Sequence, residues 1–392
     1  MPSHPTRRTT RRRFLQTSTV AAAGVVLSGG RRVQAAPSAE VLETRVISRE
    51  AQYYHGWPTV ARGKNGRLHL VWSGGREEHI CPFGRVEYMT SDDEGRTWTW
   101  PRTLLDSAID DRDAGVVETA KGSILVTSFT SLAYEESLKK AEKSGGWPAE
   151  RLAAWRAVHH RLRESERQAD LGQWMLRSTD GGRTWSARYP CLVNSPHGPI
   201  QLGDGRLLYA GKELWTGERR TGVCVSADDG QTWQWLAAIP VREGDTAEEY
   251  HELHAVDAGD GRLVVQIRNQ NHANDHETLQ SESTDGGRTW SVPHAIGVWG
   301  MPSHLLRLRN GHLLMTYGYR RAPFGNQARV SADGGRTWSE SLVISDDGAG
   351  VDLGYSSSVE LGDGQLLTVW YELMKGASKA LLRQARWKLQ GL

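Results

Sequence analysis

The sequence of 392 residues predicts an all-β fold, a six-bladed β-propeller with a helical insertion in its second blade. The first observation behind this prediction is an eight-residue pattern, Ser-x-Asp-x-Gly-x-Thr-Trp. It occurs five times, at Ser91–Trp98, Ser178–Trp185, Ser226–Trp233, Ser283–Trp290 and Ser331–Trp338. In each copy the Asp and Ser can hydrogen-bond nearby backbone, the Gly tolerates a positive φ, and the Trp can cover the turn. Each copy therefore predicts the tip of a β-hairpin.

The second observation is a two-residue turn between stretches of alternating apolar residues, a strong hairpin signal when it is Asn-Gly or Asp-Gly. Six such turns alternate with the tryptophan pattern: Asn65-Gly66, Lys121-Gly122, Asp204-Gly205, Asp260-Gly261, Asn310-Gly311 and Asp363-Gly364. Two hairpins make a four-stranded blade, and blades closed in a ring leave few exposed edges. The sixth unit lacks the tryptophan pattern, so we expect the early strand Leu42–Ser48 to complete it.

One segment interrupts this β pattern. From about residue 132 to residue 173 the apolar residues recur at helical spacing among many charges. We expect a helical insertion inside the second blade. It would be either a solvated helical hairpin on the rim or a lid over a site.

The first 36 residues have the composition of an export signal rather than of a folded domain. Arg11-Arg12-Arg13-Phe14-Leu15 precedes a mildly apolar stretch, and Val33-Gln34-Ala35-Ala36 resembles a cleavage site. The alternative is a basic tail that binds nucleic acid. The apolar stretch is too short to span a bilayer, so no stable membrane insertion is expected. We expect export by the twin-arginine route to the periplasm or the exterior, leaving residues 37–392 as one propeller domain.

Composition limits the partner class. Lysine and arginine total 48 against 46 aspartate and glutamate, a formal net charge of +2. A nearly neutral chain lacks the broad basic surface typical of nucleic-acid binding. No metal-ligand spacing is present, so we expect neither a metal nor another cofactor. The expected partner is a glycan or an acidic sugar, and the sequence gives no indication of the oligomeric state.

Together with the repeats, three stretches in the second half resemble the sialidase (neuraminidase) superfamily over nearly all of the propeller. Glu252 and Arg268 are sixteen residues apart, the spacing at which sialidases place a Glu and an Arg at the channel mouth. Arg320 resembles a carboxylate-binding arginine of the family. Tyr355 stands where the family presents its nucleophilic tyrosine. Taken alone, each residue could equally be a surface charge or a core side chain.

The chemistry explains why these residue types would occur together. A sialic acid carries a carboxylate on its anomeric carbon, which repels a charged nucleophile but not a phenol. The resemblance implies that Glu252 withdraws the proton of Tyr355 during attack, as in the tyrosine exception among glycosidases. Arg268 and Arg320 would then hold the substrate carboxylate through paired, charge-assisted hydrogen bonds.

The first half departs from the family pattern. Gly56 stands where sialidases have the first arginine of a triad, so either His55 supplies a weaker charge or the triad is incomplete. Arg76 matches a second family arginine. No aspartate follows it in the loop, and Glu78 or His79 would have to protonate the leaving group.

Two further positions complete the expected site. Asp113 matches the aspartate that contacts the sugar ring, although ion pairing around Arg112 would also explain it. His197 is one of several histidines near predicted strand starts, and we expect it to bind substrate.

We therefore expect an exo-glycosidase of sialidase type that removes a terminal acidic sugar with a Tyr355 intermediate. The first alternative is another hydrolase of anionic glycans, or a polysaccharide lyase in which His and Tyr perform β-elimination. The second alternative is a propeller that binds glycans without catalysis.

Overall fold

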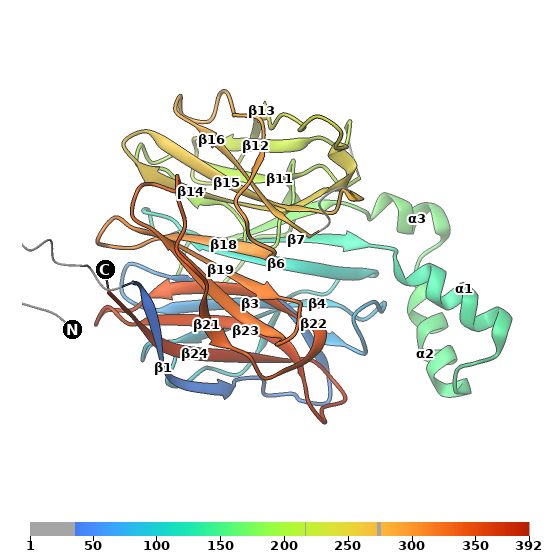
Figure 1. The fold of residues 1–392 in the computed structure, drawn as a ribbon. Helices are drawn as coiled ribbons and strands as arrows, with labels where there is room; N and C mark the ends of the chain where they lie inside the picture. Colours follow the sequence, from blue (N-terminus) through green and yellow to red (C-terminus); the bar gives the residue numbers. More distant parts are fainter. Residues whose placement is uncertain (1–35, 216, 273–275, 392) are drawn as a thin grey trace, which may run out of the picture. The chain divides into compact units, whose positions relative to one another are not determined.

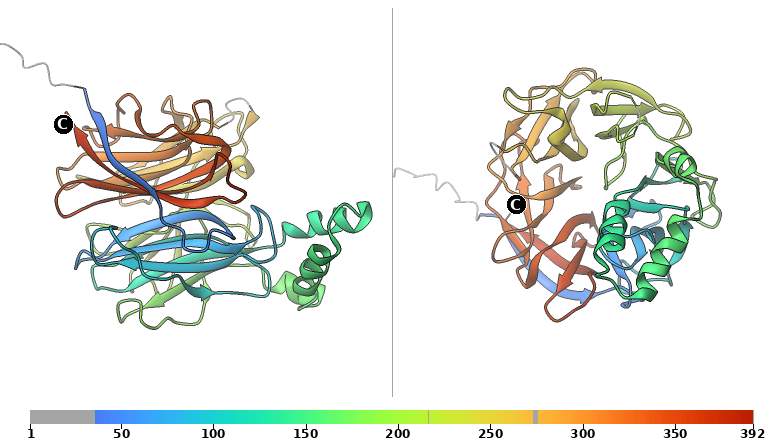
Figure 2. Two further views of the ribbon diagram at one scale, coloured as in Figure 1. Left: turned by 90° about the horizontal axis from the view of Figure 1, so that it is seen from below. Right: turned by 90° about the vertical axis from the view of Figure 1, so that its right-hand side faces the viewer.

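The computed structural model describes residues 36–215, 217–272 and 276–391. They form one compact unit of six four-stranded antiparallel sheets arranged in a ring (Figures 1 and 2). The fold is the predicted six-bladed β-propeller. The predicted export signal falls almost wholly in residues 1–35, outside the described part of the chain.

Each blade is built from consecutive strands, except the last. Blade 1 contains β2 (Tyr54–Arg62), β3 (Leu68–Arg76), β4 (Arg85–Ser91) and β5 (Arg102–Leu105). Blade 2 contains β6 (Asp110–Glu118), β7 (Ile124–Ser131), β8 (Gln173–Ser178) and β9 (Tyr189–Pro190). Blade 3 contains β10 (Ile200–Gln201), β11 (Leu207–Lys212), β12 (Thr221–Ser226) and β13 (Gln234–Ala238).

The second half of the ring follows the same order. Blade 4 contains β14 (Tyr250–Gly259), β15 (Arg262–Asn269), β16 (Thr278–Ser283) and β17 (His294–Ala295), and the short 3-10 helix Ala247–Glu249 precedes it. Blade 5 contains β18 (Met301–Arg307), β19 (Leu313–Tyr319), β20 (Gly325–Ser331) and β21 (Leu342–Ser345). Blade 6 contains β22 (Gly348–Glu360), β23 (Leu366–Met374), β24 (Leu381–Gln390) and β1 (Ser38–Val46).

The ring is closed by the N-terminal strand, as the sequence predicts. β1 pairs with β24 from Ser38 opposite Gln390 to Val46 opposite Arg383. The strand begins four residues earlier than predicted and supplies the outer edge of blade 6. Six apolar clusters, one at each junction between neighbouring blades, form the core.

The tryptophan pattern forms the turn between the third and fourth strands in blades 1 to 5. In the first copy, Thr97 donates to Asp93 through its backbone N–H (2.8 Å) and its hydroxyl (2.7 Å). Gly95, with a φ of 81°, donates to Ser91 Oγ. Trp98 then donates to Gln384 of blade 6 at 2.8 Å, so the turn also fastens neighbouring blades.

The helical insertion lies between β7 and β8 and consists of α1 (Tyr134–Ser144), α2 (Ala149–His159) and α3 (Glu164–Ala169). Tyr134, Leu138 and Trp155 pack with Cys81 and Ile109 of the neighbouring loops. The helices therefore form a fixed wall beside one sector of the ring, as the end-on view of Figure 2 shows.

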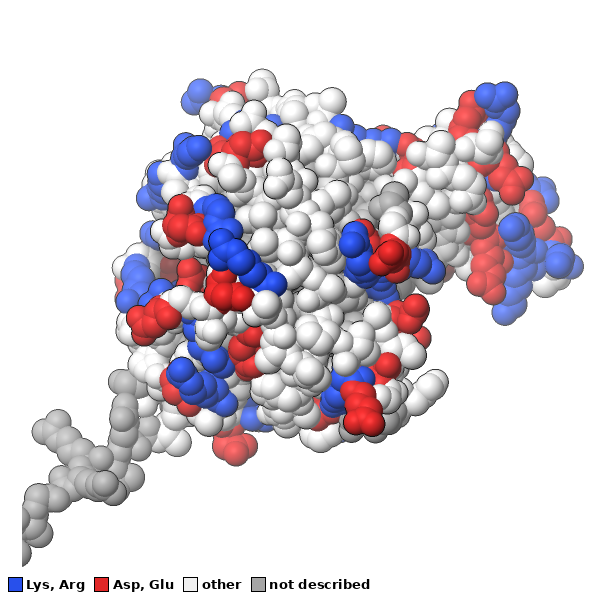
Figure 3. Space-filling view, turned by 90° about the horizontal axis from the view of Figure 1, so that it is seen from above, with Lys and Arg blue, Asp and Glu red and all other residues white. Residues whose placement is uncertain are grey.

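The first strand of each blade lines the central channel, and we call the end where these strands begin the mouth. The helices extend from the end of β7, which is antiparallel to β6, so they stand at the mouth. In the view of Figure 3, basic and acidic side chains are interspersed over the propeller and the helices. No helix among the described residues is long and apolar enough to cross a membrane.

Candidate active site

Three predicted residues meet at the mouth. The Tyr355 hydroxyl of β22 donates a 2.5 Å hydrogen bond to Glu252 Oε1 of β14. Arg268 Nη1 of β15 donates to the other Glu252 oxygen at 2.6 Å and to the Tyr355 hydroxyl at 3.3 Å. The Arg268 guanidinium therefore contacts both Glu252 and Tyr355, the two residues that the sequence analysis expects to act together.

Backbone bulges aim these side chains at the channel. The register with the neighbouring strand breaks between Gly354 and Ser357 and between His251 and His254. Within the two breaks, Tyr355 has a φ of 54° and Glu252 a φ of 45°. Left-handed backbone at bulky residues is strained and concentrates at functional sites. Blades 1 and 2 use the same device, with positive φ at Trp57 and Asp113.

The environment fixes the protonation states of the central pair. Burial, followed by the negative charge of Glu252, raises the pKa of Tyr355 well above its ordinary value. Burial also opposes ionisation of Glu252, but the charge of Arg268 and the hydrogen bonds from Arg268 and Tyr355 lower the pKa of Glu252 below its ordinary value. The resting pair is therefore a neutral phenol donating to a carboxylate.

Arg320, the second predicted carboxylate-binding arginine, also lies at the mouth. Its Nε donates to the Leu353 carbonyl at 2.9 Å and its Nη2 to the Tyr371 hydroxyl at 3.3 Å. The guanidinium carbon lies 5.8 Å from the centre of the Tyr355 ring. Its remaining amino group donates to no residue in the described part of the chain, so it is available to a ligand.

His79 belongs to a polar group that sequence reasoning did not assemble. Asp352 accepts hydrogen bonds from Tyr54 (2.9 Å), Tyr371 (3.1 Å) and His79 Nδ1 (3.1 Å). Burial lowers the pKa of His79 despite the neighbouring Asp352 carboxylate. Asp352 stands three residues before Tyr355, and this proximity in sequence is the only signal that could have identified it.

His55 does not face the mouth, and its predicted role in binding substrate is wrong. The ring is fully buried, stacks on Trp72 at 5.9 Å between ring centres and hydrogen-bonds the Glu50 carbonyl at 3.0 Å. Trp57, which is also buried, is the residue of this segment that packs against His79, Tyr355 and Tyr371.

Arg76 is also placed differently from the prediction that it binds substrate. Its side chain is fully buried, and its two amino groups donate to the two oxygens of Asp110 at 2.6 and 2.9 Å. The guanidinium lies 4.8 Å from the Trp57 ring centre. The buried Arg76 guanidinium therefore packs against the Trp57 ring, and none of its N–H groups is exposed to bind a substrate.

Arg112 is the guanidinium that sequence reasoning missed. It lies 4.5 Å from the Trp57 ring centre, and its Nε is buried without a hydrogen-bond partner. Its side chain forms no hydrogen bond or ion pair with any described residue. The one indication of Arg112 in the sequence is its position immediately before Asp113, the residue predicted to contact the sugar ring.

Asp113 lies beside this arginine on β6 and is nearly buried, with Oδ1 lacking a partner. Burial, reinforced by the charge of Glu252 and opposed by that of Arg112, raises the pKa of Asp113 to about 7. A carboxylic acid that is substantially protonated near neutral pH can donate a proton.

Glu78 and His197 lie away from this cluster. Glu78 is half-exposed and pairs with Arg151 of α2 at 2.7 Å, so it fastens the insertion rather than protonating a leaving group. His197 packs with His254 and His304 inside the channel, and no contact joins it to Tyr355 or Glu252. His197 is therefore not brought together with Tyr355, Glu252 and Arg268, and substrate binding by His197 stays a prediction.

Comparisons with known proteins agree with this description. The BNR repeat-like domain family matches residues 146–368, and the chain belongs to that family. The sialidase of Micromonospora viridifaciens is 25% identical over 214 residues, which are 43% of this chain and 31% of that protein's length. The chain thus matches less than a third of that relative.

Two solved structures share the fold. A protein of unknown function from Dyadobacter fermentans has a TM-score of 0.70 at 22% identity, covering 90% of this chain and all of the other. The NanB sialidase of Streptococcus pneumoniae has a TM-score of 0.60 at 14% identity, covering 90% of this chain and 71% of its own. These likenesses establish a sialidase-like six-bladed propeller.

Proposed function

We propose that this protein is an exo-glycosidase of sialidase type that hydrolyses a terminal acidic sugar through a covalent intermediate on Tyr355. The observation that carries the proposal is the 2.5 Å hydrogen bond from the Tyr355 hydroxyl to Glu252, with Arg268 bonded to both. A neutral phenol is the suitable nucleophile for an anomeric carbon that bears a carboxylate, because it avoids repulsion between like charges.

In the first step, Tyr355 Oη attacks the anomeric carbon while its proton passes to Glu252, and the bond to the leaving group breaks. The raised pKa of Tyr355 keeps the proton on the phenol until attack begins. Arg268 then stabilises the charge that moves between Glu252 and the phenol oxygen.

The departing oxygen needs a proton, and Asp113 is the group best suited to supply it. Its pKa, raised by burial to about 7, leaves about half of it protonated in neutral solution and most of it protonated in mildly acidic solution. In the second step the Asp113 carboxylate takes a proton from the water that attacks the anomeric carbon, and Tyr355 leaves as a phenol once Glu252 returns its proton.

The substrate carboxylate would be held by arginines from three blades. Arg268 and Arg320 supply two guanidinium groups, and Arg112, stacked on Trp57, supplies a third from blade 2. Paired hydrogen bonds from guanidinium to carboxylate favour an acidic sugar over a neutral one. The partial match to a sialidase supports N-acetylneuraminic acid as the first substrate to test.

The test is hydrolysis of aryl glycosides of N-acetylneuraminic acid, glucuronic acid and glucose by wild type and by Tyr355→Phe. We expect turnover of an acidic glycoside and loss of at least about a thousandfold in kcat for Tyr355→Phe. Tyr53→Phe is the matched control, because the Tyr53 hydroxyl bonds no residue in the described ranges. Hydrolysis by Tyr355→Phe at the wild-type rate would refute the proposal. Release of an unsaturated uronic acid from a 4-linked oligouronate, in which O4 carries a sugar that can leave, would indicate a lyase instead.

A further inference from the structure

His79, in the loop between β3 and β4, has one ring nitrogen that the protein does not use. Its Nδ1 is hydrogen-bonded to Tyr54 and Asp352, whereas its Nε2 forms no hydrogen bond with any described residue. The side chain is 43% exposed. His79 and Tyr355 both pack against the Trp57 ring, with their ring centres 5.0 and 6.3 Å from its centre. A ligand at the mouth can therefore reach His79 Nε2.

The neighbours of Nδ1 determine which nitrogen of His79 carries the proton. The Tyr54 hydroxyl donates to Asp352 Oδ1 at 2.9 Å, and this bond uses the single proton of that hydroxyl. His79 Nδ1 lies 2.9 Å from the Tyr54 oxygen and 3.1 Å from Asp352 Oδ1, so both oxygens are acceptors toward it. Nδ1 must therefore be the protonated nitrogen.

The charges of the two partners agree with this arrangement near neutral pH. Burial opposes ionisation of Asp352, but the hydrogen bonds from His79, Tyr54 and Tyr371 lower its pKa below the ordinary value. Burial, together with the charge of Arg112, lowers the pKa of His79, so the neutral ring predominates at pH 7. A neutral ring with its proton on Nδ1 has a lone pair on Nε2. His79 therefore offers a ligand at the mouth a hydrogen-bond acceptor.

One chain of hydrogen bonds joins this acceptor to an arginine of the site. Arg320 Nη2 donates to the Tyr371 hydroxyl at 3.3 Å, and that hydroxyl donates to Asp352 at 3.1 Å. Asp352 in turn accepts from His79 Nδ1. Arginine donates hydrogen bonds and accepts none, so it suits a carboxylate but leaves the protons of sugar hydroxyl groups without an acceptor. His79 Nε2 supplies such an acceptor.

We propose that His79 Nε2 accepts a hydrogen bond from a hydroxyl group of the bound acidic sugar, and that Asp352 is the positioning residue that keeps this nitrogen unprotonated. The inference rests on the proposed function for its ligand class, an acidic sugar, but not on hydrolysis of that sugar. His79 then selects among acidic sugars, because one without a donor at this position leaves the Nε2 lone pair unpaired.

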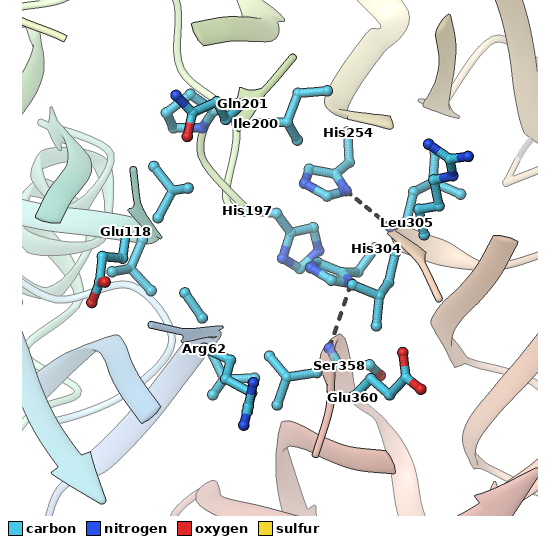
Figure 4. A pocket seen from close by; sticks show the side chains of 18 of the residues that line it. Arg62, Glu118, His197, Ile200, Gln201, His254, His304, Leu305, Ser358 and Glu360 are labelled. Carbon is cyan, nitrogen blue, oxygen red and sulfur yellow. Dashed lines mark hydrogen bonds between the residues drawn. The ribbon is translucent and has the colours of Figure 1, made fainter. Parts of the chain in front are cut away.

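The first measurement is ¹⁵N NMR of the protein labelled in its histidines, at pH 7.5, with His79 assigned by the loss of its signals in His79→Gln. We expect the Nδ1–H tautomer for His79. The internal reference is His254, whose Nδ1 accepts from Leu305 N–H at 2.9 Å inside the channel (Figure 4) and whose Nε2 is therefore protonated. Free N-acetylneuraminate or glucuronate should shift the His79 Nε2 signal and leave that of His254 in place. In Asp352→Asn the new amide can donate to Nδ1, so His79 should change to the Nε2–H tautomer.

The second measurement is the affinity for the acid that binds and for its monodeoxy derivatives, taken from the same titrations. His79→Ala should weaken binding by about three- to tenfold, the effect of one hydrogen bond between neutral groups, and His79→Gln by less, because the glutamine oxygen can accept. One monodeoxy derivative should bind more weakly to wild type by a similar factor and show no further loss in His79→Ala. His294→Ala is the matched control, since His294 is also half-exposed and bonded to a carboxylate, Glu282 at 3.0 Å, but lies on the outer strand of blade 4.

The proposal would be overturned by an Nε2–H tautomer of His79 in the free protein, or by a His79 Nε2 signal that neither acid moves. A monodeoxy loss that is equal in wild type and His79→Ala for every derivative would also overturn it. An acid that shifts the His79 signal, but whose aryl glycoside is not hydrolysed, would refute the glycosidase and leave this inference standing. Hydrolysis of an acidic glycoside whose free acid binds without moving the signal would do the reverse.

Discussion

Tyr355 donates a 2.5 Å hydrogen bond to Glu252 although 103 residues separate them. The two residues belong to blades 6 and 4, with blade 5 between them, so only the curvature of the ring brings them together. Each stands in a bulge with left-handed backbone, which turns the side chain into the channel. The strain at both positions is maintained by the surrounding sheets and supports a functional role.

Arg112 should contribute to binding of the substrate carboxylate. Arg112→Gln should raise KM for an acidic aryl glycoside by about ten- to a hundredfold, because a charge-assisted hydrogen bond is worth about 1.5 to 3 kcal/mol. The kcat should change much less. Initial rates over a range of substrate concentrations measure both constants.

Arg321→Gln is the matched control for that variant, since Arg321 stacks on the exposed Trp299 at 4.7 Å. Its KM should remain within about twofold of wild type. An unchanged KM in Arg112→Gln would show that the third guanidinium has no role in binding.

Asp113 should determine the basic limb of the pH profile. Because burial raises its pKa to about 7 in the free protein, the proportion of protonated Asp113 falls as the pH rises through that value, and kcat/KM should fall with it. Asp113→Asn should lose about a hundred- to ten-thousandfold in kcat for a glycoside with a poor leaving group, and less for an activated aryl glycoside. If the variant kept both the limb and the rate, another group would be the acid.

Asp111 should make stability depend on pH. It is fully buried, accepts from Ser107 N–H at 2.7 Å, and has a pKa that burial raises to about 8. The unfolded carboxyl has a pKa of about 3.9. Between these values the folded state binds more protons than the unfolded state. The free energy of unfolding therefore falls by up to about 1.4 kcal/mol for each unit by which the pH rises, and the stabilisation from protonated Asp111 is lost as the pH rises through about 8.

Asp111→Asn removes that titration. Denaturant unfolding at pH 5, 7 and 9 should therefore show the variant gaining stability relative to wild type as the pH rises. A difference that stays constant across the three pH values would mean that Asp111 is not the titrating group.

The sequence predicted the fold because its signals are local. Each tryptophan pattern folds within eight residues, as the bonds among Ser91, Asp93 and Thr97 show, and the spacing of the copies predicts the blades. The closing strand was also predictable, since the last unit lacked one strand. Its start at Ser38 was not, because pairing with β24 rather than local pattern sets that boundary.

The site was predicted only in part, because bulges decide which side chain faces the channel. In a regular strand His55 and Trp57 would lie on the same side. The register breaks around Gly56 separate them: both side chains are buried, but His55 lies against Trp72, whereas Trp57 packs against His79 and Tyr355. Arg76 was misplaced for another reason: its partner Asp110 belongs to the next blade, and no local pattern reveals that contact.

The most direct test of the central claim is to trap the sugar on the enzyme. Incubation with 2,3-difluoro-N-acetylneuraminic acid, or the difluoro analogue of whichever acidic sugar is hydrolysed, should slow release of the intermediate. Intact-protein mass spectrometry should then show the addition of one sugar, peptide mapping should place it on Tyr355, and Tyr355→Phe should remain unmodified. An adduct on another residue, or none from an analogue whose parent glycoside the enzyme hydrolyses, would contradict a tyrosine nucleophile.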